Sequence, residues 1–149
     1  MRRRKEKFLL FALSPLVIGY LINVLIMKSG LYGMSMMFLS LLFAAYWIYG
    51  GYRSIEIFSS RWEANLWGNG IAAIDFSLIV VQLLIFRRFL PNEFGFATQM
   101  FYLPVVRISA MVRSVLFFLP ASDMLGIFLI SFLVMCLLYN IGYSLGLRN

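Results

Sequence analysis

Asp75 is the side chain of this sequence whose position most suggests chemistry, because it lies in a stretch that is otherwise mostly apolar. Gln82 follows seven residues later, on nearly the same face of a helix after two turns. A buried carboxylate in such a place either carries a proton or a cation, or it forms an ion pair, for which Arg107 and Arg113 are the candidates. Alternatively, the carboxylate lies near the end of its helix and is hydrated. These four residues are our candidate polar or ion-pair site.

Arg107 and Arg113 lie in the segment 99–119, whose polar and apolar residues separate onto two faces of a helical wheel. Guanidinium groups bind phosphate and carboxylate oxygens well, so a lipid headgroup is one ligand that this pair suits. The alternative is a helix at a membrane surface, with both arginines extended towards water.

The composition excludes most catalytic and metal-binding chemistry. The 149 residues include no histidine, which removes imidazole bases, ordinary haem ligation and most zinc sites. The single cysteine, Cys136, lies in an apolar run and is typical of a small buried hydrophobe. The six acidic residues are scattered, with no spacing that suggests paired carboxylates. We therefore expect a protein that is not an enzyme, with no catalytic residue, no cofactor and no bound metal.

The elements that position these side chains are predicted to be membrane-spanning helices. Hydrophobic residues make up 62% of the chain and charged residues 13%. Apolar runs occupy residues 8–27, 34–52, 71–86 and 124–147, and about twenty helical residues cover the hydrocarbon of a bilayer. The sequence thus predicts an all-α fold: a polytopic integral membrane helical bundle of four transmembrane helices in a single membrane domain, residues 1–149. The segment 99–119 is predicted to lie at the interface or to pack obliquely against this bundle.

The loop between the second and third runs contains a predicted helix start. Ser60 and Glu63 have the spacing of a capping box, so a short interfacial helix is expected from about Arg61. The sequence Gly68-Asn69-Gly70 is expected to break that helix and to lead into the next span.

Basic residues favour a cytoplasmic N-terminus. Five of the thirteen precede the first apolar run: Arg2, Arg3, Arg4, Lys5 and Lys7. The positive-inside rule explains this cluster better than nucleic-acid binding does, so membrane lipids are expected partners and nucleic acid is not. The lack of N-x-Ser/Thr sequences fits a bacterial cell membrane.

The number of crossings has two solutions. Four crossings return the C-terminus to the cytoplasmic side but leave Arg87, Arg88, Arg107 and Arg113 outside, against the charge rule. Five crossings bury Arg107 and Arg113 and move the C-terminus outside. We favour four and keep five as the alternative.

Gly142 and Gly146 form a G-x-x-x-G pattern, which lets two helices approach closely. Their partner is either another helix of this chain or a second protein. The favoured function is a non-catalytic membrane subunit or accessory protein that packs against other membrane protein subunits, in a secretion, transport or envelope complex. One alternative is a small homo-oligomeric transporter or channel with Asp75 and Gln82 in its path. A further alternative is a lipid-binding protein that uses Arg107 and Arg113.

Overall fold

The computed structural model describes residues 2–29, 34–88, 98–116 and 124–148. Every regular element in these ranges is a helix: α1 (Arg2–Ser29), α2 (Met34–Ser54), α3 (Arg61–Val81), the π-helical turn η1 (Gln82–Phe86), α4 (Gln99–Tyr102), α5 (Val106–Val115) and α6 (Met124–Gly146). Four helices are long and apolar enough to cross a membrane: Phe8–Ser29, Met34–Ser54, Arg61–Phe86 and Met124–Gly146. The predicted all-α fold with four spanning helices is confirmed.

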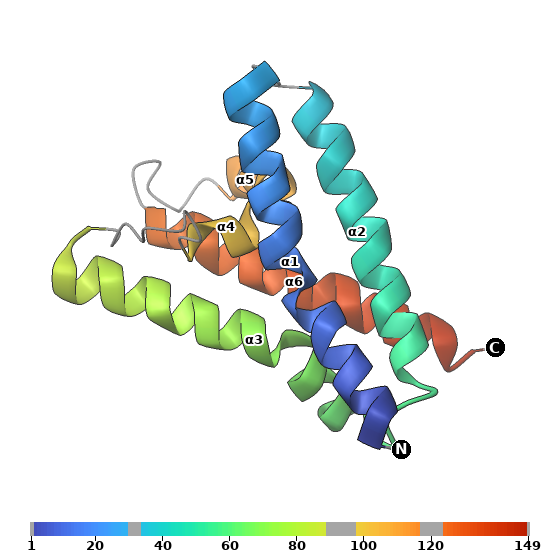
Figure 1. Ribbon diagram of the computed structural model, residues 1–149. Coiled ribbons are helices and arrows are strands. Elements are labelled where there is room, and N and C mark those ends of the chain that lie inside the picture. Colours follow the sequence, from blue (N-terminus) through green and yellow to red (C-terminus); the bar gives the residue numbers. More distant parts are fainter. Residues whose placement is uncertain (1, 30–33, 89–97, 117–123, 149) are drawn as a thin grey trace.

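The four long helices form two pairs that meet at one end. Figure 1 shows α1 and α2 running together, and α3 and α6 running at a steep angle to them. Both termini lie near the corner where the two pairs meet, because successive long helices run in opposite directions. The connection between α2 and α3 lies at this end as well, so an even number of crossings puts the N- and C-terminal ends on one side of a membrane.

Helix α1 begins within the basic cluster and passes through Pro15 without ending. Proline cannot donate a hydrogen bond to the carbonyl four residues earlier, which here belongs to Phe11. The Ser14 hydroxyl donates to that carbonyl at 2.6 Å and lies 2.8 Å from the Tyr46 hydroxyl of α2. The side chain before the proline thus satisfies the carbonyl that the proline leaves open, and it links α1 to α2.

Helix α3 is continuous, so the predicted break at Gly68-Asn69-Gly70 is wrong. Glycine in a helix costs only about 1 kcal/mol, and tertiary packing outweighs that here. A Cβ atom at Gly68 would lie 2.5 Å from the Tyr139 ring, so glycine is what lets α6 come close. The Tyr139 hydroxyl donates to the Ala64 carbonyl at 3.0 Å. The predicted start is confirmed: Ser60 is the N-cap, and its hydroxyl accepts from the Glu63 amide at 3.1 Å.

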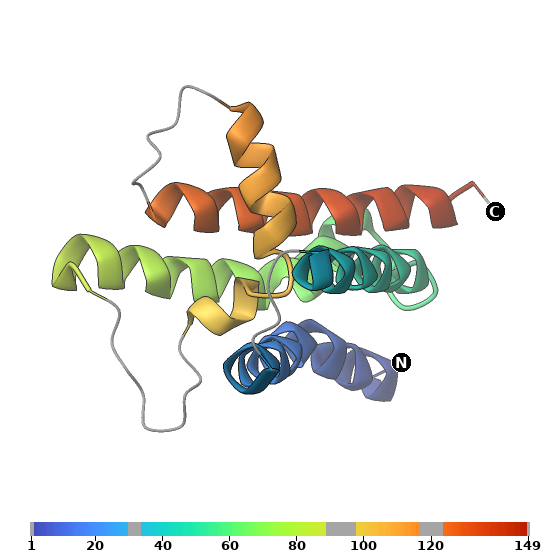
Figure 2. The ribbon, with the colours of Figure 1, turned by 90° about the horizontal axis from the view of Figure 1, so that it is seen from above.

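The segment 98–116 is not one helix: its first part enters the bundle, whereas its second part, α5, packs across α6 with most of its residues at least partly exposed. It forms two short helices, α4 and α5, separated by a turn that contains Pro104. Figure 2 shows α4 between α1 and α3, and α5 lying across α6. The longest helix in these residues has ten residues, about half of what a fifth span needs. Residues 117–119 of the predicted amphipathic segment lie outside the described residues.

The middle of this segment is among the most deeply buried parts of the protein. Phe101, Tyr102, Pro104 and Val105 are all nearly or fully inaccessible. The Tyr102 hydroxyl donates to the Ala72 carbonyl of α3 at 2.6 Å. Irregular backbone is tolerated at membrane depth only where protein surrounds it, and these contacts supply that surrounding.

Candidate functional site

Asp75 lies on α3 with its side chain half-buried. Its Oδ2 atom is inaccessible and has no hydrogen-bond partner, and Asp75 forms no ion pair within the described ranges. Gln82, the first residue of η1, is half-buried too. Both polar side chains lie on the helix that was expected to carry them.

The arginines proposed as partners of Asp75 lie on α5. Arg107 is exposed, whereas Arg113 is half-buried near the end of the helix. The residue of α5 that turns fully inwards is Ser109, whose hydroxyl donates to the Val105 carbonyl at 3.1 Å.

Gly142 and Gly146 lie against α2 of the same chain. A Cβ atom at Gly142 would collide with the Ile48 carbonyl oxygen and lie 2.9 Å from the Tyr52 amide. A Cβ atom at Gly146 would lie 3.1 Å from the Tyr52 carbonyl oxygen. Gly51 on α2 makes the reciprocal approach, since its Cβ would lie 3.1 Å from the Tyr143 amide. The G-x-x-x-G face of α6 is therefore occupied within the chain.

A network of side-chain amides joins α3 to α6 near the end that carries the termini. Asn65 and Asn140 exchange two hydrogen bonds: the Asn65 amide donates to Asn140 Oδ1 at 3.1 Å, and the Asn140 amide donates to Asn65 Oδ1 at 2.9 Å. Arg61 Nε donates to the same Asn140 oxygen at 2.9 Å, and Asn69 donates to Asn65 at 3.2 Å. The Asn140 amide also donates to the Cys136 carbonyl at 2.8 Å. The network fixes the Arg61 side chain at the start of α3.

Sequence reasoning missed this network, although one half of it had a readable signal. Arg61, Asn65 and Asn69 are four residues apart, so they form a polar stripe on one face of α3. Asn140 is an isolated amide within an apolar run, which is the usual appearance of a residue that bonds across to another helix.

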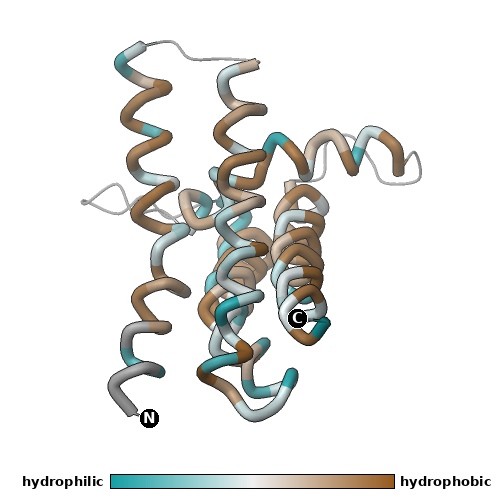
Figure 3. The backbone as a smooth tube through the Cα atoms, turned by 90° about the vertical axis from the view of Figure 1, so that its right-hand side faces the viewer, coloured by the Kyte–Doolittle hydropathy of each residue, from teal (hydrophilic) through white to brown (hydrophobic). Residues whose placement is uncertain are grey.

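An ion pair holds the start of α1 to the start of α3. Lys5 Nζ contacts Glu63 Oε1, and the Ser59 hydroxyl donates to the other carboxylate oxygen at 3.2 Å. Lys5 also lies 5.7 Å from the centre of the Phe58 ring. Hydrophilic residues gather at this end of the molecule, near both termini, as Figure 3 shows.

An apolar groove of about 320 Å³ runs between α1 and α2. The two helices run side by side in Figure 3, but their backbones stay apart. Four residues of each helix line the groove: Ile18, Leu21, Ile22 and Leu25 on α1, and Leu39, Leu42, Phe43 and Tyr46 on α2. Both sets follow the spacing i, i+3, i+4, i+7, the pattern with which one helix packs against another.

The described residues hold no group of three or more Cys, Asp or Glu side chains that could bind a metal ion. An all-α chain with four apolar helices of spanning length is a polytopic helical membrane protein. No family model, curated protein or solved structure matches the chain.

Proposed function

We propose that the protein is a non-catalytic integral membrane subunit that packs against a helix of a larger membrane assembly. In this proposal the protein resides in the cell membrane of a bacterium. Its N-terminus is cytoplasmic, as the basic cluster before the first span predicts. The observation that carries the proposal is the apolar groove between α1 and α2.

The groove has the shape and chemistry that a partner helix requires. Each wall presents apolar side chains over two helical turns, and both walls have helix-packing periodicity. A third apolar helix placed along the groove would complete a three-helix contact within the hydrocarbon region. Two of the residues that line the groove are half-exposed without such a partner: Leu21 is 54% exposed and Leu42 is 52% exposed.

The rest of the chain supports a role in binding instead of catalysis. The G-x-x-x-G face is packed against α2, whereas the groove is a surface of helix-packing character that is open in the described residues. Outside the four spans, the described residues form the basic start of α1, the short connection between α2 and α3, the segment 98–116 with the short helices α4 and α5, and two residues after each of η1 and α6. A protein of this form acts through the surface that it presents within the bilayer.

The test fills the groove with larger side chains and measures whether the partner protein still binds. The double variant Leu21→Trp/Leu42→Trp places bulk at two half-exposed positions, and Leu133→Trp changes a residue of α6 that is also 54% exposed but lies outside the groove. Each tagged protein is purified in mild detergent, and the proteins bound to it are quantified by mass spectrometry. We expect a stoichiometric membrane protein partner with the wild type and with Leu133→Trp, and its loss with the double variant.

A photoreactive residue at position 21 identifies the occupant directly. Crosslinking to the same partner protein supports the proposal. Crosslinking to lipid alone would indicate that the groove binds an acyl chain. Crosslinking to a second copy of the chain would indicate a homo-oligomer instead of a larger assembly. Either result contradicts the proposed function.

A second candidate is a small oligomeric transporter or channel with Asp75 and Gln82 in its path. The observation that favours it is the inaccessible Asp75 Oδ2 atom, which has no hydrogen-bond partner in the mostly apolar second half of α3. The measurement is proton flux into liposomes that contain the protein, read with a pH-sensitive dye. Asp75→Asn abolishes the flux in a transporter that uses this carboxylate, whereas Glu56→Gln, on the α2–α3 connection, leaves it unchanged. Flux that Asp75→Asn does not alter would remove this candidate.

A further inference from the structure

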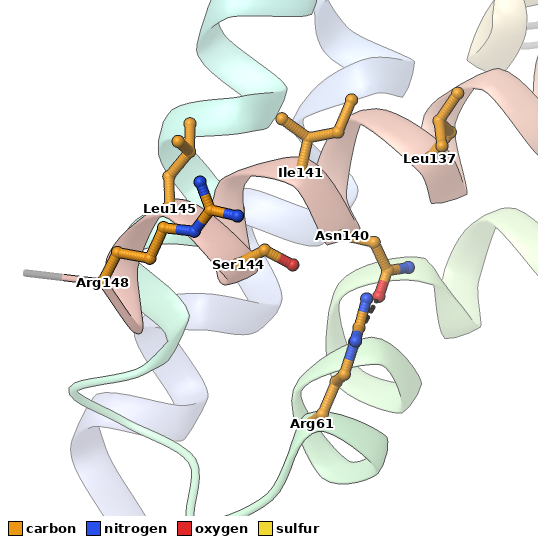
Figure 4. A pocket seen from close by; sticks show the side chains of 7 residues that line it. All are labelled: Arg61, Leu137, Asn140, Ile141, Ser144, Leu145 and Arg148. Atoms are coloured by element: carbon orange, nitrogen blue, oxygen red, sulfur yellow. Dashed lines mark hydrogen bonds between the residues drawn. The ribbon is translucent and has the colours of Figure 1, made fainter.

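We infer that a pocket between the start of α3 and the end of α6 binds the phosphate group of a membrane phospholipid. The pocket has a volume of about 290 Å³. Figure 4 shows its polar side chains, Arg61, Asn140, Ser144 and Arg148, around one opening. None of these four was identified as a candidate from the sequence.

Two arginines give the pocket its charge. Arg61 comes from the first turn of α3 and Arg148 from just beyond the end of α6, and they lie on opposite sides of Ser144 (Figure 4). Neither guanidinium forms an ion pair with a carboxylate in the part of the chain that the structure describes. Guanidinium groups bind phosphate oxygens in two-pronged geometry, so an oxyanion between them is the complementary ligand.

The Arg61 side chain is held in place before any ligand arrives. Its Nε donates to Asn140 Oδ1 at 2.9 Å, which leaves the two terminal nitrogens of the guanidinium to face a ligand. Asn140 is itself fixed by its double hydrogen bond with Asn65. Preorganisation of this kind lowers the entropy that binding must overcome. The Ser144 hydroxyl, on the same side of α6, adds a neutral donor to the pocket.

The remaining wall indicates that the phosphate belongs to a lipid. Leu137, Ile141 and Leu145 are four residues apart on α6 and are 61%, 40% and 46% exposed. Arg61 and Gly146 are the end residues of their spans, so the polar part of the pocket lies at headgroup depth. The leucine and isoleucine stripe runs from there towards the hydrocarbon, along the path of an acyl chain. A free phosphate ion would use the arginines but not this stripe.

The test measures how tightly the purified protein holds phosphatidylglycerol, by native mass spectrometry from detergent with phosphatidylcholine as the competing lipid. Arg148→Gln removes an exposed charge beyond the end of α6, so folding is not at stake, and Arg61→Gln/Arg148→Gln removes both charges. We expect phosphatidylglycerol binding to weaken about tenfold in the double variant and to a smaller extent in Arg148→Gln. Arg53→Gln is the matched control, because it removes an exposed arginine at the same end of the molecule but outside the pocket.

Four results would overturn the inference. Unchanged lipid binding in the double variant would show that the pocket is not the site. An equal loss in Arg53→Gln would reduce the effect to general surface charge. Displacement of the lipid by millimolar inorganic phosphate would assign the pocket to a free oxyanion. The variant Arg107→Gln/Arg113→Gln separates this pocket from the other arginine pair, and lipid loss in that variant alone would also contradict the inference.

Discussion

Asn65 of α3 and Asn140 of α6 hydrogen-bond to each other twice, each donating its amide to the carbonyl oxygen of the other. The two side chains are 75 residues apart in sequence, and they join two of the four spanning helices. An amide pair of this kind satisfies two donors and two acceptors that would otherwise be costly to bury.

We expect Asn140→Ala to destabilise the protein by about 1–3 kcal/mol, because it leaves the Asn65 amide and the Arg61 guanidinium without their shared partner. The measurement is thermal unfolding in detergent, followed by circular dichroism. Asn23→Ala is the control, since Asn23 is an equally isolated amide on α1 but has no hydrogen bond among those of the described residues. The variants Asn65→Ala and Asn65→Ala/Asn140→Ala complete a double-mutant cycle, and the double variant should lose less stability than the sum of the two single losses. An additive result would show that the two amides do not stabilise the fold through each other.

Because α2 and α6 approach closely at Gly51 and Gly142, we expect the effect of a glycine-to-alanine substitution on stability to depend strongly on its position. Gly142→Ala forces a methyl group into the Ile48 carbonyl, so it should destabilise the fold by about 1–3 kcal/mol. Gly70→Ala is the matched control, because no atom lies within 4 Å of the added Cβ. At Gly70 the substitution should stabilise α3 by about 0.5–1 kcal/mol, since alanine favours a helix more than glycine does. The same thermal unfolding measurement distinguishes the two, and equal effects at both positions would contradict the close packing.

The hydrogen bond from Ser14 to the Phe11 carbonyl should contribute to stability because Pro15 leaves that carbonyl without a backbone donor. Ser14→Ala removes the hydroxyl that donates to the Phe11 carbonyl, and Pro15 has no amide hydrogen to replace it. We expect Ser14→Ala to lower the stability by about 1 kcal/mol in the wild-type background. The cost should shrink in the Pro15→Ala background, where the new backbone amide bonds to Phe11. A double-mutant cycle measures this coupling, and an additive result would mean that the hydroxyl acts through Tyr46 instead.

The four spans could be predicted from the sequence because hydropathy over twenty residues depends on composition alone. The boundaries differ mostly by a few residues: the run at 124–147 corresponds to α6 at Met124–Gly146. Helix α1 begins earlier than the apolar run at 8–27, because the basic residues before Phe8 continue the helix. Charge excludes those residues from the hydrocarbon but not from a helix.

The continuity of α3 could not be predicted, since it depends on Tyr139. Glycine at position 68 suggested a break, and only the ring of a residue far along the chain explains why glycine is there. The burial of Tyr102 and Val105 was missed for a similar reason: the segment 98–116 balances charge against apolar residues, and its place is decided by the space between α1, α3 and α6.

The pairing of Asn65 with Asn140 could be predicted only in part from the sequence. The stripe of Arg61, Asn65 and Asn69 marks a polar face on α3. The sequence does not show which amide bonds to this face of α3, because Asn23 and Asn140 are both isolated amides in apolar runs. The packing of α3 against α6 brings Asn140, and not Asn23, next to Asn65.

The arrangement of the long helices predicts which residues share a side of the membrane. Glu56 and Leu147 lie at the end that carries both termini, whereas Arg88 follows the far end of α3. Single cysteines at these three positions, in a Cys136→Ala background, can be labelled with a membrane-impermeant maleimide. With a cytoplasmic N-terminus, we expect Arg88→Cys to react in intact spheroplasts, and Glu56→Cys and Leu147→Cys to react only in inverted vesicles. The Cys136→Ala protein without added cysteine is the control for background labelling. Reaction of Leu147→Cys from the same side as Arg88→Cys would require an odd number of crossings, and it would place Arg61 and Arg148, which line one pocket, on opposite sides of the bilayer.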